Sequence, residues 1–323
     1  MKILATIKDA RTMGISGHIR PDGDSIGASL GLYLYLKKHL PKARIDLFME
    51  EPPEVFMHLK GMNEIYTAKD ADDADEIRYD VFFALDSAKE RLGLAEKHFE
   101  KARLKINIDH HVSNSGAGDI NVLRPDVTSA CEVLYELLDE PVDIDADIAQ
   151  ALYMGIVHDT GMFRFAGTSA RTLEVAALLM AHDFDFARLI HETVHEKTYV
   201  QQQILGRALL ESIIFMDGRA IVSALDKKIL DFYQASPGDL EGIVNQLMIT
   251  KGVECAIFIH QLASLEYKVS LRSADKVNVA QIATFFGGGG HVRAAGVTMK
   301  GTVHDVVNNL SYHIEQELLK SDV

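Results

Sequence analysis

The sequence predicts an α/β fold followed by a smaller α+β domain. Through residues 1–190, apolar runs of strand length alternate with helical patterns, which favours a mostly parallel sheet with helices on both faces. From residue 211 the pattern changes, because "SIIFMDGRAIVSAL" reads as two strands about an Asp-Gly turn, a strong hairpin signal. We therefore expect a first domain at 1–190, a helical linker at 191–210 and a second domain at 211–323.

The first domain is expected to begin with a strand and a helix that Asp24 or Ser25 caps. Apolar runs rich in Ile, Val and Phe predict strands at 14–19, 44–50, 79–86 and 104–111. Helical patterns occupy 25–40, 129–140, 146–159 and 169–182. In such a sheet, ligands bind beyond the carboxyl ends of the strands, where the strand order reverses.

The second domain is expected to contain paired strands and separate helices. After the polar and then helical segment 191–210 come the hairpin, a helical stretch, strands at 255–262 and 266–273, and a helix at 278–286. The glycine-rich run "GGGGHVRAAG" follows. Hairpins with separate helices are typical of a small α+β domain.

Composition limits the partners. The 323-residue chain has a net charge of −14, so it lacks the overall basic bias expected of a protein that tracks long nucleic acid. No apolar run approaches membrane-spanning length, and the start of the chain is too charged for a signal peptide. Two cysteines, Cys131 and Cys255, form no disulfide framework. We expect a cytoplasmic protein that acts on short substrates and contacts no membrane.

Metal-binding side chains follow the predicted strands of the first domain. They are His18, Asp22 and Asp24 after the first strand, Asp86 after the third, Asp109-His110-His111 after the fourth, and His158-Asp159 late in a helix. Each alone is typical of a cap or a turn, but carboxylates gathered without basic partners repel unless a cation offsets them. Oxygen and imidazole ligands without thiolates suit manganese, magnesium, iron or zinc, with manganese favoured. A shared carboxylate would allow two metals to drive in-line phosphoryl displacement by a bridging water.

These segments resemble the DHH phosphoesterase superfamily in "GHIRPDGDSIGA", "ALDSA", "NIDHHVSN" and "GIVHDTGMF", while "SLRS", "NVAQIA" and "GGGGHVRAAG" resemble its DHHA1 domain. The resemblance implies one metal held by His18, Asp22 and Asp86. It implies a second held by Asp24, Asp86, His110 and Asp159, so that Asp86 bridges. His111 would contact the scissile phosphate, and Asp109 would hold the Asp109-His110-His111 triplet in position. The expected catalytic residues are His111, Asp109 and Asp86. His158 departs from the family pattern and is open to two interpretations, a further contact or a histidine on a helix face.

The glycine run also has two interpretations. It is either a flexible loop or an anion site, in which backbone N–H groups converge and nearby side chains add charge-assisted bonds. We favour phosphate or nucleotide binding by Arg272, Ser273, Gly288, Gly289, Gly290, His291 and Arg293. The resemblance implies that this region faces the metal site across an interdomain cleft.

Within the superfamily, size and domain content favour the stand-alone bifunctional oligoribonucleases and pAp phosphatases. The resemblance implies two divalent ions, most naturally Mn²⁺ with Mg²⁺ as the alternative. It implies short RNA oligonucleotides (nanoRNA), dinucleotides and nucleotide bisphosphates as substrates, and it leaves a homodimer open. Two alternatives remain: a phosphodiesterase for linear dinucleotides such as pApA and pGpG, or a nucleotide-binding sensor without turnover.

Overall fold

The computed structural model describes residues 2–67, 77–138 and 144–321. The chain folds into two compact units, Met1–Glu196 and Lys197–Val323. The boundary between them falls inside the segment 191–210 that was expected to be a linker. The helical part of that segment, α8 (Tyr199–Leu210), packs through Ile204 and Ala208 into the core of the second unit.

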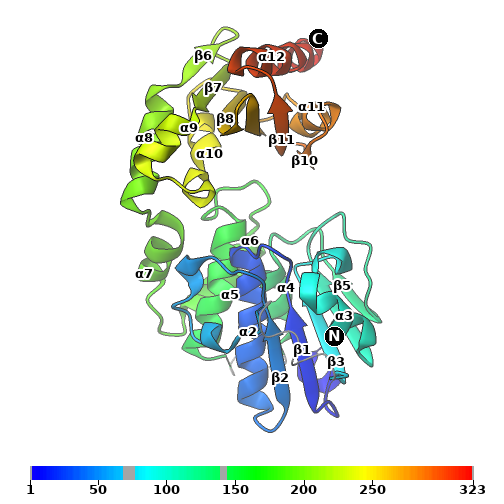
Figure 1. Ribbon diagram of the computed structural model, residues 1–323. Coiled ribbons are helices and arrows are strands. Elements are labelled where there is room, and N and C mark those ends of the chain that lie inside the picture. The colour runs from blue at the N-terminus through cyan, green and yellow to red at the C-terminus, as the bar shows by residue number, and fades with distance from the viewer. Residues whose placement is uncertain (1, 68–76, 139–143, 322–323) are drawn as a thin grey trace. The chain divides into compact units, whose positions relative to one another are not determined.

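Unit 1 is built on a five-stranded sheet in which every neighbouring pair of strands is parallel. Its strands are β1 (Thr12–Ser16), β2 (Arg44–Phe48), β3 (Val81–Leu85), β4 (Leu104–Asp109) and β5 (Ile120–Leu123). They lie in the order β2-β1-β3-β4-β5 (Figure 1). The predicted parallel sheet is confirmed, and β5 is a fifth strand that the sequence pattern did not reveal.

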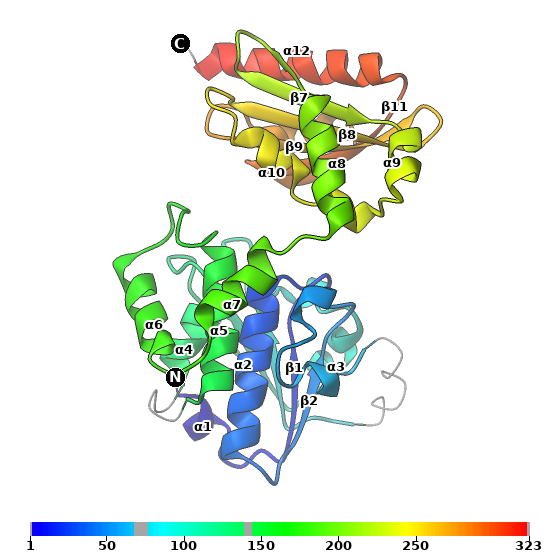
Figure 2. The same cartoon turned by 90° about the vertical axis from the view of Figure 1, so that its left-hand side faces the viewer.

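Helices cover both faces of this sheet (Figure 2). The α-helices of unit 1 are α1 (Ile3–Thr6), α2 (Gly23–His39), α3 (Glu96–Lys101), α4 (Ala130–Leu137), α5 (Ala146–Asp159), α6 (Ala170–Met180) and α7 (Phe186–Ile190). Strand β3 shows why both faces are covered: Val81 and Phe83 join the core under α2, α4 and α5, whereas Phe82 joins the core under α3. Since successive side chains of a strand point to opposite faces, a fully apolar strand needs two cores.

The first long helix begins earlier than predicted. Its N-cap is Asp22, whose Oδ1 accepts hydrogen bonds from the backbone N–H groups of Asp24 and Ser25. Asp24 therefore lies inside the first turn, and the expected cap at Asp24 or Ser25 is wrong. The reason lies in tertiary structure, because the Asp24 carboxylate is bound by another helix.

Helices α2 and α5 pack closely through glycines. A β-carbon on Gly27 would lie 2.5 Å from the Ala151 carbonyl oxygen, and one on Gly31 would lie 2.8 Å from Leu152. The two helices can therefore approach more closely than side chains of ordinary size allow. This brings the N-terminus of α2 toward the C-terminal end of α5.

Unit 2 is built on a six-stranded mixed sheet in the order β10-β11-β9-β8-β7-β6. Its strands are β6 (Ile213–Phe215), β7 (Ala220–Leu225), β8 (Cys255–Ala263), β9 (Glu266–Ser273), β10 (Gly289–His291) and β11 (Ala294–Lys300). Its α-helices are α8, α9 (Lys227–Tyr233), α10 (Ile243–Met248), α11 (Val279–Phe285) and α12 (Val303–Ser321). The predicted hairpin is β6–β7, but β7 and β8 are parallel because α9 and α10 connect them.

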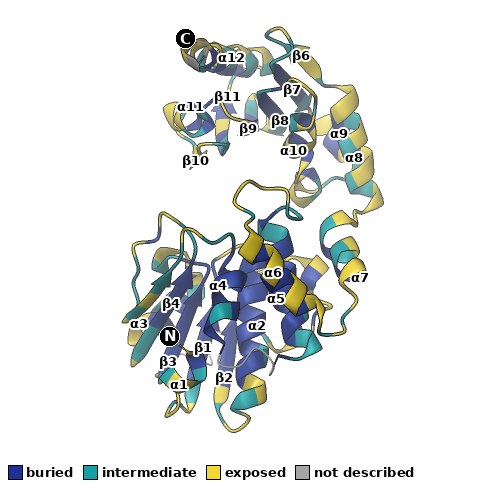
Figure 3. Cartoon of the chain, turned by 180° about the vertical axis from the view of Figure 1, so that it is seen from behind, coloured by how far each residue is buried: buried dark blue, intermediate teal, exposed yellow. Residues whose placement is uncertain are grey.

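The end of the chain differs from the sequence expectation in two ways. The last glycines of the run pair as strand β10 with β11, so the run is not simply a loop. Helix α12 then packs Val306, Leu310 and Ile314 against one face of the sheet, at the spacing of a helical stripe. Figure 3 colours each described residue of the chain as buried, intermediate or exposed. Among the helices of the described ranges, none is both long and apolar enough to span a bilayer.

Candidate functional site

The candidate site lies where the strand order of unit 1 reverses. Strand β1 has β2 on one side and β3 on the other, so the connections leaving β1 and β3 diverge and leave a crevice beyond their carboxyl ends. His18 follows β1 by two residues and Asp86 directly follows β3. Asp86 has a φ of 51°, a left-handed conformation that aspartate tolerates better than most residues.

Three imidazoles surround the buried Asp86 carboxylate. Its Oδ1 lies 3.3 Å from both His110 Nε2 and His111 Nδ1, and its Oδ2 lies 3.5 Å from His18 Nε2. These separations are long for strong hydrogen bonds. Within the described residues, Oδ1 has no partner of good hydrogen-bond geometry although it is fully buried. A buried carboxylate oxygen in this condition fits a site that holds a cation.

The side chains form three groups whose potential ligand atoms lie within 4.8 Å of one another. The groups are His18-Asp22-Asp86, Asp24-His110-Asp159 and Asp86-Asp109-His110-His111. Every residue expected to bind metal is thus brought into one cluster, and its oxygen and imidazole donors suit a divalent ion. Asp86 and His110 each belong to two groups, and the two oxygens of Asp86 face different histidines.

Asp24 is held in place by helix α4. Its Oδ2 accepts a hydrogen bond from Ala130 N (2.6 Å) and its Oδ1 accepts one from Cys131 N (3.0 Å). These are orphan N–H groups of the first turn of α4, which Ser129 caps. Room for the carboxylate depends on Gly155, where a β-carbon would lie 2.9 Å from Asp24 Oδ1. Burial raises the pKa of Asp24 well above its usual value.

Asp109 organises the histidine pair. Its Oδ1 accepts hydrogen bonds from the backbone N–H groups of His110 (2.7 Å) and His111 (3.0 Å), and it lies 2.8 Å from His111 Nδ1. Its Oδ2 accepts from Asn114 Nδ2. Burial acts to raise the pKa of Asp109, but the bonds from His111 and Asn114 outweigh it and lower the pKa. Asn114 was not singled out from the sequence, although it ends the same motif.

The carboxylates strongly change the basicity of the histidines. Burial alone would lower the pKa of His18, but Asp22 and Asp86 raise it to about 10. Burial likewise opposes protonation of His110, yet Asp86 and its neighbours raise that pKa to about 9. Hydrogen bonding to Asp109 raises the pKa of His111 to about 10. Burial raises the pKa of Asp159 to about 6.

His158 lies beside the cluster but belongs to different contacts. Its Nε2 lies 3.2 Å from the Thr193 hydroxyl, which is in the π-helix η7 (His191–His195), and its ring packs edge-on at 5.3 Å from Phe56. A β-carbon on Gly23 would lie 2.3 Å from the His158 ring, so the ring packs directly on the start of α2. These contacts favour the packing interpretation of His158.

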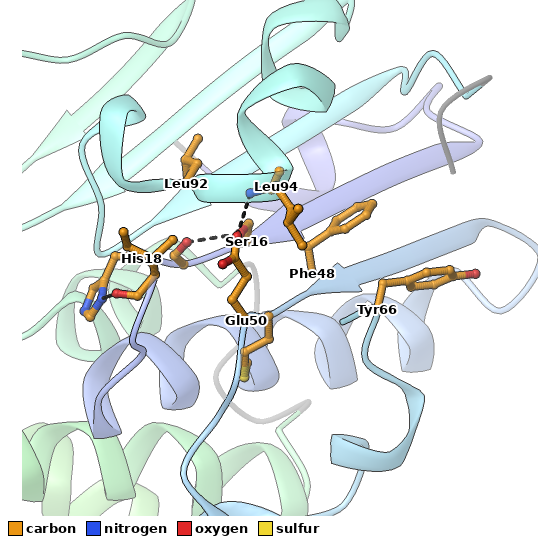
Figure 4. A pocket seen from close by; sticks show the side chains of 11 residues that line it. Ser16, His18, Phe48, Glu50, Tyr66, Leu92 and Leu94 are labelled. Carbon is orange, nitrogen blue, oxygen red and sulfur yellow. Dashed lines mark hydrogen bonds between the residues drawn. The ribbon is translucent and has the colours of Figure 1, made fainter. Parts of the chain in front are cut away.

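A small pocket lies next to His18 and is too small for a substrate. Figure 4 shows it between the β1 end, Phe48 and the loop at Leu92–Leu94. Its volume of about 10 Å³ admits about one water molecule. Glu50 accepts a hydrogen bond from Leu94 N (2.7 Å) and so holds this loop against the His18 segment.

In unit 2 the sheet aligns two of the expected substrate residues. His291 on β10 is opposite Ala294 on β11, which is opposite Arg272 on β9. Residues opposite one another across a sheet share a face, so Arg272 and His291 lie on the same face. Arg272 Nε donates to Asn245 Oδ1 on α10 (2.9 Å), and burial lowers the pKa of the guanidinium. Asn245 is a contact that no local sequence signal indicated.

The other residues that were expected to bind substrate already make contacts within unit 2. Ser273 donates to the Val277 carbonyl (2.6 Å), and Arg293 binds both that carbonyl and Asp275. Gly288 and Gly290 lie against the backbone of β11, where a β-carbon would come within 2.3 and 2.4 Å of carbonyl oxygens, while Gly289 is exposed. A shallow pocket of about 450 Å³ is lined by Gly290, His291, Val292, Asn278, Ala280, Gln281 and Thr284.

Fold and site together define a two-domain protein with an aspartate–histidine cluster on a parallel α/β sheet. The chain belongs to the DHH family: the model for the DHH family, N-terminal domain, matches residues 12–156, and that for the DHHA1 domain matches residues 217–320. This confirms the resemblance that the motifs indicated.

Relatives and a solved structure agree with this assignment. The bifunctional oligoribonuclease and PAP phosphatase NrnA of Thermus thermophilus is 32% identical over 291 residues, which cover 89% of this chain and 84% of that protein. The protein of the same name from Bacillus subtilis is 25% identical, covering 92% of each chain. The crystal structure of an exopolyphosphatase-related protein from Bacteroides fragilis superposes with a TM-score of 0.89 at 25% identity, covering 97% of this chain and 94% of that one.

Proposed function

We propose that this protein is a metal-dependent phosphoesterase that hydrolyses short RNA to mononucleotides and removes the 3′-phosphate of 3′-phosphoadenosine 5′-phosphate (pAp). The observation that carries the proposal is the cluster centred on Asp86, whose two oxygens face different histidines at the switch point of the sheet. The names of the relatives from Thermus thermophilus and Bacillus subtilis support the same substrates.

The ligand sets proposed are those of the sequence analysis. One ion would be held by His18, Asp22 and Asp86, and the other by Asp24, Asp86, His110 and Asp159, with Mn²⁺ as the first choice and Mg²⁺ as the alternative. When bound, such ions supply a water of lowered pKa and neutralise the charge of the phosphate.

The residues beside the ligands have separate tasks. Asp109 accepts from His111 Nδ1 and so fixes the ring, which leaves Nε2 to contact a phosphate oxygen and to pass a proton to the leaving group. The His111 side chain is about one-third exposed, so it is accessible to a substrate.

Unit 2 is proposed to hold the other end of the substrate. Arg272 has its Nε bound to Asn245 and one Nη1 hydrogen bond to its neighbour's carbonyl, and the remaining donors of its guanidinium suit a phosphate. His291 and the glycines before it would complete the anion site, together with Ser273 and Arg293.

The test is a substrate panel on metal-stripped protein to which Mn²⁺ or Mg²⁺ is added back. We expect Mn²⁺-dependent release of inorganic phosphate from pAp and of mononucleotides from RNAs of two to about five nucleotides. Turnover of pApA and pGpG alone would instead identify a linear-dinucleotide phosphodiesterase. Tight nucleotide binding without any turnover in Mn²⁺ would identify a sensor and overturn the proposal.

A further inference from the structure

The segment that follows Asp159 has an unusual backbone. Gly161, Met162 and Phe163 have φ angles of 55°, 60° and 61°, so three successive residues are left-handed. This conformation is unfavourable for Met and Phe, which carry a β-carbon. Surrounding contacts must therefore hold the turn, and such strain is concentrated at functional sites.

Hydrogen bonds and packing hold this turn in place. Met162 N donates to the Val157 carbonyl (2.8 Å), and Phe163 N donates to the Thr160 hydroxyl (3.0 Å). The side chains of Met162 and Phe163 pack against the main core of unit 1. The turn thus partly buries two apolar side chains and fixes the course of the next two residues.

Phe165, in contrast, is left on the surface. Its side chain is 57% exposed, and its ring covers Gly161, where a β-carbon would lie 2.6 Å from the ring. Within the described part of the chain, no other aromatic ring packs on Phe165. Gly161 is only two residues from Asp159, so the residue that the ring covers is close in the chain to a proposed metal ligand.

A cation accompanies the ring. Arg164 Nε donates to the Gly161 carbonyl (2.8 Å), which anchors the exposed arginine next to Phe165. Among the residues that the structure describes, no hydrogen bond engages its Nη groups. An aromatic face beside an arginine is how proteins hold single-stranded nucleotides: the base stacks on the ring and the cation meets the phosphate. A half-exposed phenyl ring also gains from being covered by an apolar face.

We propose that Phe165 is a substrate-positioning residue, which stacks against the base of the nucleotide whose phosphate lies at the Asp86 cluster, with Arg164 beside its backbone. This inference rests on the proposed function and extends it, because it assigns base recognition to unit 1. A phosphate and its base are separated by only one ribose, so a ring held on Gly161, two residues after the proposed ligand Asp159, is a candidate to meet that base. Stacking accepts any base, so the contact favours nucleotides over other phosphate esters without selecting a sequence.

The experiment compares pAp with ribose 3,5-bisphosphate, which has the same phosphates and no base. Phe165→Leu keeps an apolar side chain over Gly161 but removes the aromatic face, and Phe165→Tyr restores that face. We expect Phe165→Leu to lower the preference for pAp over the abasic compound by about ten-fold in kcat/KM, within the range for one stacked base. Phe165→Tyr should keep the preference of the wild type. Phe232→Leu, at a 79% exposed phenylalanine on α9, is the matched control.

A binding measurement separates this inference from the proposed function. The fluorescence of a 2-aminopurine analogue of pAp should be quenched on binding to wild-type protein loaded with Mn²⁺, and less so with Phe165→Leu. Equal losses for pAp and the abasic compound, with unchanged quenching, would mean that Phe165 only supports the loop and would overturn the inference. If the wild type hydrolyses neither compound, the proposed function fails, while the quenching still decides whether Phe165 stacks on a base.

Discussion

Asp86 is the residue through which the parts of the site are connected. It is fully buried, has a left-handed backbone, and lies within 3.5 Å of nitrogen atoms of His18, His110 and His111. These histidines hold its pKa well below the usual value even though burial opposes ionisation. Its charge therefore matters both to the proposed metals and to the imidazoles around it.

Replacing that charge is the first prediction. Asp86→Asn should lower kcat/KM by about a thousand-fold or more and reduce bound Mn²⁺, because an amide cannot serve as an anionic ligand to two ions. In EDTA it should also lower the free energy of unfolding by about 3–5 kcal/mol, since protonated histidines lose a buried partner. Metal analysis, kinetics and denaturant unfolding measure these effects. Asp126→Asn, at an exposed carboxylate, is the control, and normal activity of metal-free Asp86→Asn protein would contradict the two-metal mechanism.

The second residue-scale prediction concerns unit 2. Arg272→Ala and His291→Ala should each weaken substrate binding by on the order of 1.5–3 kcal/mol, the cost of one charge-assisted phosphate contact. Manganese content should not change. Arg293→Ala should have a smaller effect on KM, because its donors already bind Asp275 and the Val277 carbonyl. Calorimetric titration checks this, and loss of Mn²⁺ with normal substrate affinity would show that the binding region is misassigned.

At the scale of elements, the contact of α2, α4 and α5 fixes the proposed metal ligand Asp24. Asp24 enters from the first turn of α2, α4 supplies two N–H groups to it, and Gly155 of α5 leaves the space that it occupies. A single methyl group at residue 155 would also lie 2.2 Å from Cys131 Sγ. Helix packing and ligand position are therefore coupled.

Two glycine-to-alanine substitutions test this coupling. Gly155→Ala should destabilise the protein by about 1–3 kcal/mol through overpacking and should displace Asp24, which lowers both activity and Mn²⁺ affinity. Gly206→Ala in α8 has no atom within 4 Å of the new β-carbon, so it should stabilise by about 0.4–1 kcal/mol and leave activity unchanged. Thermal unfolding and enzyme kinetics of the two variants test both expectations. A Gly155→Ala protein that is as active and stable as the wild type would refute the close packing.

At the scale of the whole molecule, the net charge predicts a limit on the length of the substrate. The chain has 33 basic and 47 acidic residues, which gives a net charge of −14 and no overall excess of cations to attract a polyanion. We therefore expect the further phosphates of a long RNA to gain little from counterion release.

Activity should therefore depend on RNA length. Initial rates at equal concentration should fall once the RNA exceeds about five nucleotides, and the salt dependence for short substrates should be shallow. The measurement is a series from dinucleotides to RNAs of about 24 nucleotides, at two salt concentrations. Equal or faster degradation of the longest RNAs would indicate a processive exonuclease.

The sequence by itself determined the types of element and the chemistry at their ends. Strand β9 and helix α5 have the predicted bounds, because their patterns of period 2 and 3.6 are local and strong. His18, Asp86 and the triplet at 109–111 follow apolar strands, and parallel strands deliver such residues to one edge whatever their order. That is why the members of the candidate cluster could be named before any contact was known.

Only the tertiary structure decided which of these groups meet. The strand order β2-β1-β3-β4-β5 places His18 beside Asp86. The Asp24 carboxylate binds the N-terminus of α4, so Asp22 caps α2 instead. Asn245 is far in sequence from its partner Arg272, so no short stretch of the chain contains both. Asn114 is close in sequence to its partner Asp109, but their hydrogen bond depends on the folded loop between them. The short strand β10 forms because β11 supplies its hydrogen bonds, against the low strand propensity of glycine. Local sequence sets propensity and side-chain chemistry, whereas long-range packing selects the contacts that turn them into a site.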